Sequence, residues 1–107
     1  MTRHGFVVRV RPEKREEYLE LHRTVWPRVE EAMRENGIRH YSIFIIDDVL
    51  FGCYEYVGHD YEADLARIQR DETSQEWWTY TDPCQVPFGD AAGGSVWREM
   101  DLAWHME

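Results

Sequence analysis

The chain has 107 residues, of which 43% are hydrophobic and 31% are charged, so it has the size of one domain and enough apolar side chains for one core. Twelve basic against twenty-one acidic residues leave a formal net charge of −9 at pH 7. Such a field repels a phosphate backbone and an anionic lipid surface, which excludes nucleic acid and membranes as expected partners and leaves neutral ligands open.

The N-terminal third of the chain predicts a strand followed by one long helix. Phe6 to Val10 is a β-rich run. Apolar residues then recur at spacings of three and four from about Glu13 to Glu35, which predicts an amphipathic helix that ends at Asn36-Gly37. The apolar stripe of this helix contains Tyr18, Leu21, His22, Val25, Val29 and Ala32.

Pro27 lies inside this predicted helix. Because proline lacks a backbone N–H and clashes with the carbonyl four residues before it, we expect a kink near Trp26. His22 lies about one turn before that kink.

The middle of the chain predicts a β-hairpin. His40 to Ile46 and Val49 to Val57 are strand-like runs, and Asp47-Asp48 separates them as a turn. Both alternating sets of the first strand are largely apolar, with Tyr41, Ile43 and Ile45 on one side and Phe44 and Ile46 on the other. A strand with one solvent-facing side would alternate with polar residues. We therefore expect both faces to be covered, the second by another copy of the chain in a homodimer.

The remaining chain predicts two short helices, a loop and a last strand. Asp60 is expected to cap a helix that carries Tyr61, Leu65 and Ile68. Thr73-Ser74-Gln75-Glu76 is a capping-box pattern at the start of the next helix, which carries Trp77-Trp78. Asp82 to Ser95 is rich in Pro and Gly and predicts a loop, and Val96 to Trp104 predicts the final strand.

The resulting order is β-α-β-β-α-β with an extra short helix before the last strand. It is typical of an α+β fold, a ferredoxin-like sandwich in which helices cover one face of an antiparallel sheet. We expect residues 1–107 to form a single domain of this kind, whose open sheet face pairs with that of a second copy to make a dimeric αβ barrel.

His22 is the first candidate for chemistry, because it lies four residues after Tyr18 on a stripe that is otherwise apolar. Two interpretations stay open: a buried structural histidine held by one hydrogen bond, which the spacing by itself favours, and an acid/base group. Tyr18 and Tyr41 are ordinary core or strand tyrosines by position, yet each could offer a sugar a ring and a hydroxyl together.

Trp77-Trp78 is the most informative pair. Adjacent residues on a helix diverge by about 100°, so the two indoles cannot fill the same place in a core. They serve equally well as anchors of an amphipathic helix and as walls of a concave pocket. Flat indoles match the C–H faces of a pyranose and the methyl group of a 6-deoxy sugar.

Other motifs are weak. The remaining histidines lack ligand spacing, and the sequence shows no phosphate loop and no nucleophile elbow. We therefore expect no metal and no other cofactor. Cys53 and Cys84 have no CxxC-type neighbour, which favours reduced thiols, and the apolar stretch at the start is too short for a signal sequence. Both observations predict a cytoplasmic protein.

Three segments jointly resemble the L-rhamnose mutarotase family. They are Tyr18-x-x-x-His22-x-x-x-Trp26-Pro27, Asn36-Gly37-Ile38-Arg39-His40-Tyr41-Ser42-Ile43 and Trp77-Trp78, in matching order over roughly residues 1–80. The resemblance implies a dimeric αβ barrel that interconverts the α and β anomers of L-rhamnose or a related deoxyhexose without a cofactor. It also implies that His22 is the proton donor and that Tyr18, Tyr41, Trp77 and Trp78 contact the sugar.

The segment after Tyr80 departs from this family's pattern. Thr81-Asp82-Pro83-Cys84-Gln85 and the glycine-rich stretch Gly89 to Gly94 replace a different segment. If that segment closes the pocket, the sugar is another deoxyhexose or the function has changed. Two alternatives therefore stay beside the mutarotase: a cofactor-free or haem-dependent monooxygenase-type αβ barrel, and a non-catalytic sugar-binding module.

For a mutarotase, the chemistry needs one proton delivered to the ring oxygen and one removed from the anomeric hydroxyl. A histidine with its ordinary pKa of about 6.5 can do either. Partial burial is expected to lower the pKa of His22 and to favour the neutral form, whose remaining N–H can still donate. The second proton is left to a tyrosine or a water.

Overall fold

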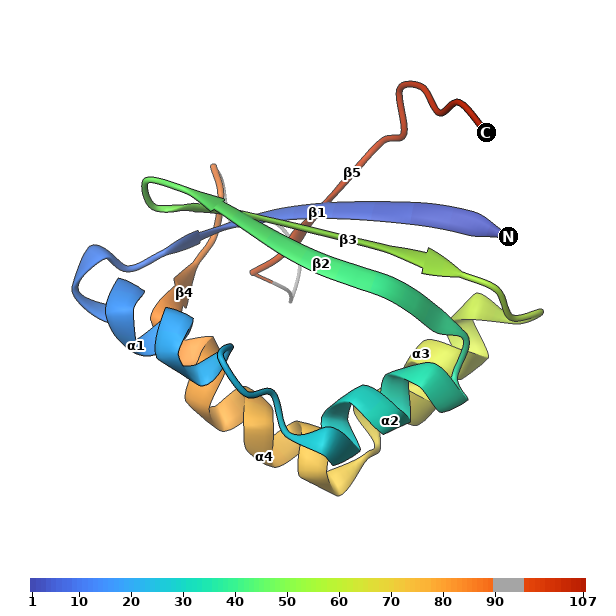
Figure 1. Cartoon of the computed structure of the whole chain (residues 1–107), viewed down its shortest axis with the longest axis horizontal. Coiled ribbons are helices and arrows are strands. Elements are labelled where there is room, and N and C mark those ends of the chain that lie inside the picture. Colours follow the sequence, from blue (N-terminus) through green and yellow to red (C-terminus); the bar gives the residue numbers. More distant parts are fainter. Residues whose placement is uncertain (90–95) are drawn as a thin grey trace.

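The computed structural model describes residues 1–89 and 96–107. A curved sheet forms one layer, and the helices pack against one of its faces (Figure 1). The strands are β1 Thr2–Val10, β2 Ile38–Ile46, β3 Val49–Tyr56, β4 Gln85–Val86 and β5 Arg98–Met100. The helices are α1 Arg15–Leu21, α2 Pro27–Glu35, α3 Tyr61–Gln69 and α4 Glu72–Thr81, with the short 3-10 helices η1 Pro12–Lys14 and η2 Asp82–Cys84.

The sheet is antiparallel, with strand order β2-β3-β1-β4 and with β5 also paired to β1. β2 and β3 form the predicted hairpin, and its turn contains Asp47 at a φ of 51°, a left-handed conformation that a short polar side chain tolerates. Along the chain, α1 and α2 connect β1 to β2, and α3 and α4 connect β3 to β4. All four helices pack on the same face of the sheet. This arrangement confirms the predicted ferredoxin-like α+β fold.

The core lies between the sheet and the helices. Every second residue of β1 and β3 points toward the helices, so Val8 and Leu50 are completely buried. A first cluster joins Val8, Val10, Tyr18, Leu50 and Cys84, and a second joins Ile38, Tyr54, Tyr56 and Ile68. Across the described residues no helix has both the length and the apolar character that a bilayer crossing needs.

The single kinked helix predicted from Glu13 to Glu35 is wrong. The chain instead forms α1 and α2 as separate helices, and α2 begins at Pro27. Pro27 pushes the preceding Trp26 out of the helical region, to a ψ of 130°, and then serves as the first residue of α2, where its missing N–H costs nothing. As a result His22 is the residue that ends α1 rather than one in mid-helix.

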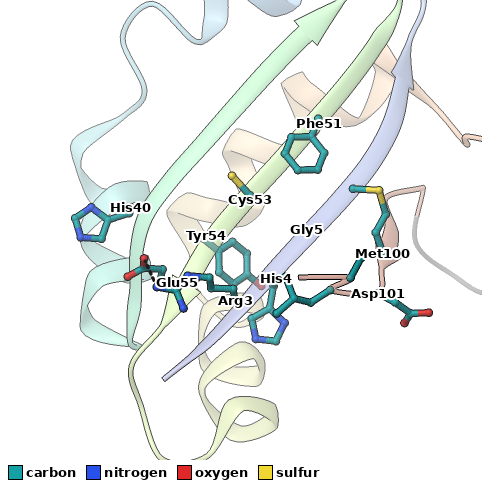
Figure 2. Close-up of a pocket in the computed structure, with 12 residues that line it drawn as sticks. Arg3, His4, Gly5, His40, Phe51, Cys53, Tyr54, Glu55, Met100 and Asp101 are labelled. Atoms are coloured by element: carbon teal, nitrogen blue, oxygen red, sulfur yellow. Dashed lines mark hydrogen bonds and ion pairs between the residues drawn. The ribbon is translucent and has the colours of Figure 1, made fainter. Parts of the chain in front are cut away.

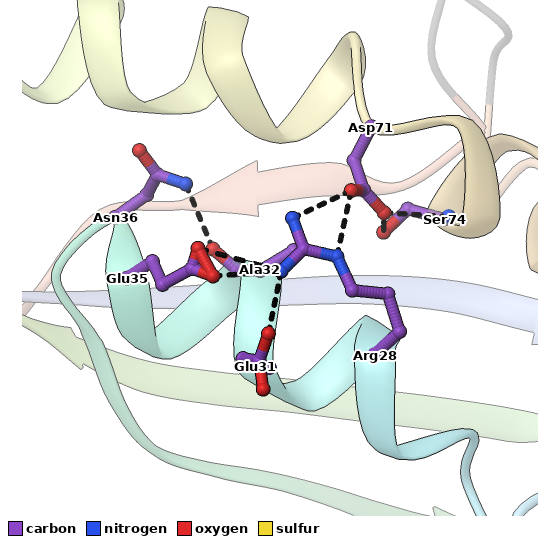
Figure 3. A network of polar contacts seen from close by, with 7 residues as sticks. All are labelled: Arg28, Glu31, Ala32, Glu35, Asn36, Asp71 and Ser74. Atoms are coloured by element: carbon purple, nitrogen blue, oxygen red, sulfur yellow. Dashed lines mark hydrogen bonds and ion pairs between the residues drawn. The ribbon is translucent and has the colours of Figure 1, made fainter.

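The predicted capping box at Thr73 is also wrong, because α4 begins earlier. Asp71 caps it, and its carboxylate accepts hydrogen bonds from the Ser74 backbone N–H at 2.9 Å and the Ser74 hydroxyl at 2.8 Å. Figure 3 shows Arg28 of α2 reaching the same carboxylate at 2.8 Å while it also binds Glu31 and Glu35 on its own helix. These bonds hold the pKa of Asp71 below its usual value, with the Ser74 hydroxyl the largest cause, and they fasten α2 to the start of α4.

The last strand predicted from Val96 to Trp104 shortens to Arg98–Met100. A strand forms only where a neighbour takes up its backbone hydrogen bonds, and β5 pairs with β1 only opposite Gly5 to Val7. After Met100 the chain rises from the sheet on the side away from the helices (Figure 1). Its exposed apolar residues there are Leu102, Trp104 and Met106.

The other predicted boundaries shift by a few residues. Asp60 caps α3 as expected, accepting from the Ala63 N–H at 3.1 Å, and Gly37 ends α2 at a φ of 86°. The segment expected as a loop from Asp82 to Ser95 contains η2 and β4 instead. Most of the glycine-rich stretch Gly89 to Gly94 lies outside the described residues.

Candidate active site

A cavity of about 270 Å³ lies between α1, α4 and the helix-covered face of the sheet. All five residues singled out by the sequence border it: Tyr18, His22, Tyr41, Trp77 and Trp78. An adjoining cavity of about 330 Å³ shares His22, Tyr41 and both indoles with it. Residues from three separate parts of the chain therefore converge on one concave space.

His22 enters this cavity from the end of α1. Its Nδ1 lies 2.9 Å from the backbone carbonyl oxygen of Tyr18, and since a carbonyl can only accept, Nδ1 carries a proton. In the neutral imidazole Nε2 is then the acceptor. Burial lowers the pKa of His22, and the hydrogen bond to Tyr18 opposes this shift in part. The group is therefore a neutral base near pH 7 with its Nε2 lone pair available.

Two aromatic rings fix the plane of the imidazole. The ring of Tyr18 stacks on it at a centroid distance of 4.3 Å, and the indole of Trp77 meets it edge-on at 5.4 Å. Trp77 in turn packs edge-on against Trp26, 5.3 Å away. Because each neighbour is itself packed, the imidazole is held in one orientation.

Tyr18 belongs to the core and to the cavity at once. Its side chain is only 2% exposed. Burial raises the pKa of its hydroxyl above the ordinary value, and the neighbouring Tyr41 raises it further. A hydrogen bond with the Gln85 side chain partly opposes this rise, because it stabilises the ionised form of the tyrosine. The hydroxyl consequently keeps its proton at any physiological pH and can act as a hydrogen-bond donor.

Tyr41 points into the cavity because of a β-bulge. The register between β2 and β3 shifts by one residue between Arg39 and Ser42, and His40 within this step has a φ of 53°. The extra residue changes which face the following side chains take, so Tyr41 lies on the same face as Ile43. Desolvation raises the pKa of Tyr41 to about 12.

The two indoles divide their roles. Trp77 is 5% exposed, whereas Trp78 is half-buried and packs against the second core cluster. Both border the two adjoining cavities. The two explanations that the sequence left open therefore hold together: the pair anchors α4 and also walls the pocket.

The chain matches the model of the family described as L-rhamnose mutarotase over residues 3–106. It belongs to the L-rhamnose mutarotase family. An L-rhamnose mutarotase of Pectobacterium atrosepticum is 33% identical over 99 residues, which cover 85% of this chain and 92% of that protein. One of Oceanobacillus iheyensis is 31% identical over 107 residues and covers both chains completely. The predicted family and its isomerase class are thereby confirmed.

Solved structures show the same fold. The L-rhamnose mutarotase FA22100 of Formosa agariphila superposes with a TM-score of 0.76 at 24% identity over the whole of both chains. Tetracenomycin F2 cyclase of Streptomyces glaucescens follows at 0.66 and 19% identity, again over both whole chains. A monooxygenase of Nitrosomonas europaea, described as putative for antibiotic biosynthesis, reaches 0.59 at 14% identity over 96% of this chain and 100% of that one. At such identities the likeness is one of fold, so the monooxygenase-type alternative is not favoured.

Four further residues border the cavity: Thr81, Asp82, Gln85 and Trp97. The sequence analysis named Thr81 to Gln85 only as a segment that departs from the family's pattern and would bear on closing the pocket, and it assigned none of the four to the site. Three of them lie at or just beyond the end of α4, where η2 and β4 turn the chain back toward β1. Their spacing carries no periodic signal, so sequence patterns could not find them. Desolvation raises the pKa of Asp82, which adds a carboxyl group to the rim of the pocket.

A different cavity lies on the other face of the sheet (Figure 2). It measures about 340 Å³ and is bordered by Phe51, Cys53 and Tyr54 of β3 and by Met100 and Leu102 near the C-terminus. Over residues 1–89 and 96–107, no three His, Cys, Asp or Glu side chains converge in a way that could hold a metal ion.

Proposed function

We propose that this chain interconverts the α and β anomers of L-rhamnose in the cavity between α1, α4 and the sheet. The observation that carries the proposal is His22, a histidine whose Nε2 has no partner within residues 1–89 and 96–107 and which lies in an aromatic-walled pocket of a chain that belongs to the mutarotase family. A neutral monosaccharide also suits a chain with a net charge of −9, because it meets no electrostatic barrier.

His22 supplies the main proton transfer. Its neutral imidazole takes the proton of the anomeric hydroxyl at Nε2, since Nδ1–H is already bound to the Tyr18 carbonyl. The bond between C1 and the ring oxygen breaks as the C1 carbonyl forms. After C1 has rotated, the imidazolium returns its proton to the carbonyl oxygen as the ring closes on the other face. Positioned transfers of this kind contribute about 10²–10⁴-fold in rate.

This role refines the expected one. The sequence analysis let the neutral imidazole donate its remaining N–H proton, but that hydrogen belongs to Nδ1 and faces a backbone carbonyl. His22 therefore acts first as a base and donates only on ring closure. The ring oxygen receives its proton from water at the open side of the pocket when the ring opens, and it returns that proton to the water when the ring closes. The Tyr18 and Tyr41 hydroxyls serve as hydrogen-bond donors there, because their raised pKa values keep them protonated.

The indoles bind the sugar through its apolar parts. Trp77 and Trp78 both border the cavity, and the flat face of an indole can cover the C–H face of a pyranose. A 6-deoxy sugar adds a methyl group, whose burial is worth about 0.8 kcal/mol per carbon. This term favours L-rhamnose and related deoxyhexoses over sugars with a hydroxymethyl group.

We also propose that two copies pair through the sheet faces that carry no helices. Phe44 and Ile46 of β2 are 61% and 70% exposed there, and large apolar patches on a small protein mark association surfaces. The resulting homodimer would be a dimeric αβ barrel. A cytoplasmic location agrees with Cys53 and Cys84, which are both free thiols.

Saturation-transfer NMR tests the activity directly. One anomeric proton of L-rhamnose is irradiated, and the loss of signal from the other anomer reports exchange, with L-fucose and galactose run in parallel for specificity. We expect exchange well above the spontaneous rate with L-rhamnose. Sugar binding without faster exchange would instead identify a non-catalytic sugar-binding module and overturn the proposal.

A further inference from the structure

Asp82 is the one carboxylate among the described residues that border the cavity beside His22. It directly follows Thr81, the last residue of α4, and it is exposed at the rim, where a molecule in the cavity can reach it. Neighbouring protein atoms displace part of its water, which raises its pKa, and within residues 1–89 and 96–107 neither a hydrogen bond nor a cation opposes this rise. The described part of the chain therefore gives this carboxylate no partner.

The position of Asp82 is unfavourable for a carboxylate that serves only the fold. The carbonyl groups at the end of a helix carry partial negative charge, which repels an anion. The last turn of α4 has no basic residue that would offset this repulsion, and the start of η2 receives no capping hydrogen bond from a side chain. A charge that destabilises the fold and makes no structural contact indicates a role in binding.

The cavity has more hydrogen-bond donors than strong acceptors. Two tyrosine hydroxyls that keep their protons and two indoles, which can only donate, border it. Nε2 of His22 is the acceptor for the anomeric hydroxyl, so the hydroxyl protons at C2, C3 and C4 of a sugar need another acceptor. The Asp82 carboxylate offers two oxygens and a negative charge, and a hydrogen bond to a charged acceptor is stronger than one between neutral groups.

We propose that Asp82 is a specificity-determining residue whose carboxylate accepts hydrogen bonds from two neighbouring ring hydroxyls of the sugar. The inference rests on the proposed function, since it takes a sugar to be the occupant of the cavity. The two oxygens of a carboxylate lie side by side and can each accept from one of two adjacent hydroxyls. Every adjacent pair among the hydroxyls at C2, C3 and C4 includes the one at C3, so the C3 hydroxyl binds Asp82.

The 3-deoxy derivative of L-rhamnose lacks this hydroxyl, and it tests the inference together with the replacement Asp82→Ala. At anomeric equilibrium, turnover makes no net product, so the dissociation constant of each sugar can be measured by calorimetry on the active protein. We expect the natural chain to bind the 3-deoxy sugar about tenfold more weakly than L-rhamnose, because it loses a hydrogen bond to a charged group. In Asp82→Ala the acceptor is gone, and the two sugars should bind within about twofold of each other.

Glu76→Ala is the matched control, because it removes the same charge from an exposed position of α4 that borders neither of the two adjoining cavities. It should leave the discrimination between the two sugars unchanged. Thermal melts give a second measurement. Asp82→Ala should melt at or above the temperature of the natural chain, because it removes an anion from the end of α4. A clearly lower melting temperature would show that the carboxylate serves the fold and would overturn the inference.

An affinity ratio of the two sugars that is equal in the natural chain and in Asp82→Ala would also overturn the inference. The saturation-transfer assay with L-rhamnose separates the two proposals. Discrimination that depends on Asp82 without anomer exchange defeats the proposed activity and leaves the inference standing. No binding of L-rhamnose at all defeats both.

Discussion

The two faces of the sheet are both rich in large apolar side chains, but they differ in the polar groups that border their cavities. On the helix-covered face, a histidine, two tyrosine hydroxyls and an amide converge on a cavity of about 270 Å³. The opposite face has a larger cavity, of about 340 Å³, bordered mostly by apolar groups and lined by residues of β1, β3 and the segment from Met100 to Ala103 (Figure 2). The size of a cavity is therefore not what distinguishes the proposed active site; its polar groups are.

The same contrast separates two histidines. His4 of β1 borders the outer cavity, and both of its ring nitrogens have partners: Nε2 lies 2.8 Å from the Thr2 hydroxyl and Nδ1 lies 3.2 Å from a Glu99 carboxylate oxygen. His22 has one nitrogen bound to a backbone carbonyl, and its Nε2 has no partner among the described residues. A free ring nitrogen, rather than the residue type, distinguishes a base from a structural histidine.

The largest expected effect comes from making the same substitution at these two histidines. His22→Gln should slow anomer exchange by about 10²–10⁴-fold, because an amide cannot take a proton near neutral pH. His4→Gln keeps a donor and an acceptor for its neighbours and should leave exchange within about twofold of the natural rate. Saturation-transfer NMR measures both. Near-normal exchange in His22→Gln would refute its role.

The pH profile sharpens the assignment of His22. Burial disfavours the charged imidazolium, so the pKa of His22 lies below the usual 6.5. The base is therefore neutral and active at pH 7, and activity should fall about tenfold per pH unit only below that lowered pKa. Exchange measured from about pH 4.5 to 8, with the spontaneous rate subtracted, gives the midpoint. A midpoint above 6.5 would contradict a buried neutral base.

The residues on the helix-covered face were largely predictable from the sequence, because their placement depends on local spacing along the chain. Tyr18, Trp77 and Trp78 lie on helices and His22 caps the end of α1, so the spacing of Tyr18 and His22 by four residues predicts that they share a face. Tyr41 was assigned to the correct side by its alternation with Ile43, although the bulge that sets this orientation leaves no sequence signal. Resemblance to the family, rather than spacing, gave these residues their chemical roles.

Features that depend on distant partners were not predictable. Gln85 reaches the cavity only because β4 pairs with two residues at the end of β1, and no periodicity marks a two-residue strand. The start of α4 was misplaced because the Asp71 carboxylate competes with Thr73 for the capping role and also binds Arg28 from α2. Long-range contacts of this kind override local preference.

Two glycines test how tightly each face is packed. A Cβ on Gly52 of β3 would lie 3.3 Å from Cζ3 of Trp97 and 3.6 Å from Cε1 of Tyr41, so Gly52→Ala should displace the ring of Trp97 at the cavity. We expect KM for L-rhamnose to rise about three- to tenfold with a smaller change in kcat. Gly5→Ala meets Phe51 and Met100 at ordinary contact distances of 3.5 and 3.6 Å and should leave KM unchanged. An equal KM in both variants would show that the sugar does not reach this part of the cavity.

Substitutions on the sheet face without helices should have the smallest effect on the rate of anomer exchange and the clearest effect on dimer formation. Phe44→Glu places a charge in the middle of the exposed apolar patch, where a second copy would have to bury it without a partner. Light scattering should then show the mass fall from twice 12.9 kDa to 12.9 kDa. Val57→Glu, a similar change at an exposed position just after β3, should leave the dimer intact.

All the cavity residues named above come from one chain, so anomer exchange per chain should persist in the monomer. A natural chain that already has the mass of one copy would show that this face serves some contact other than self-association.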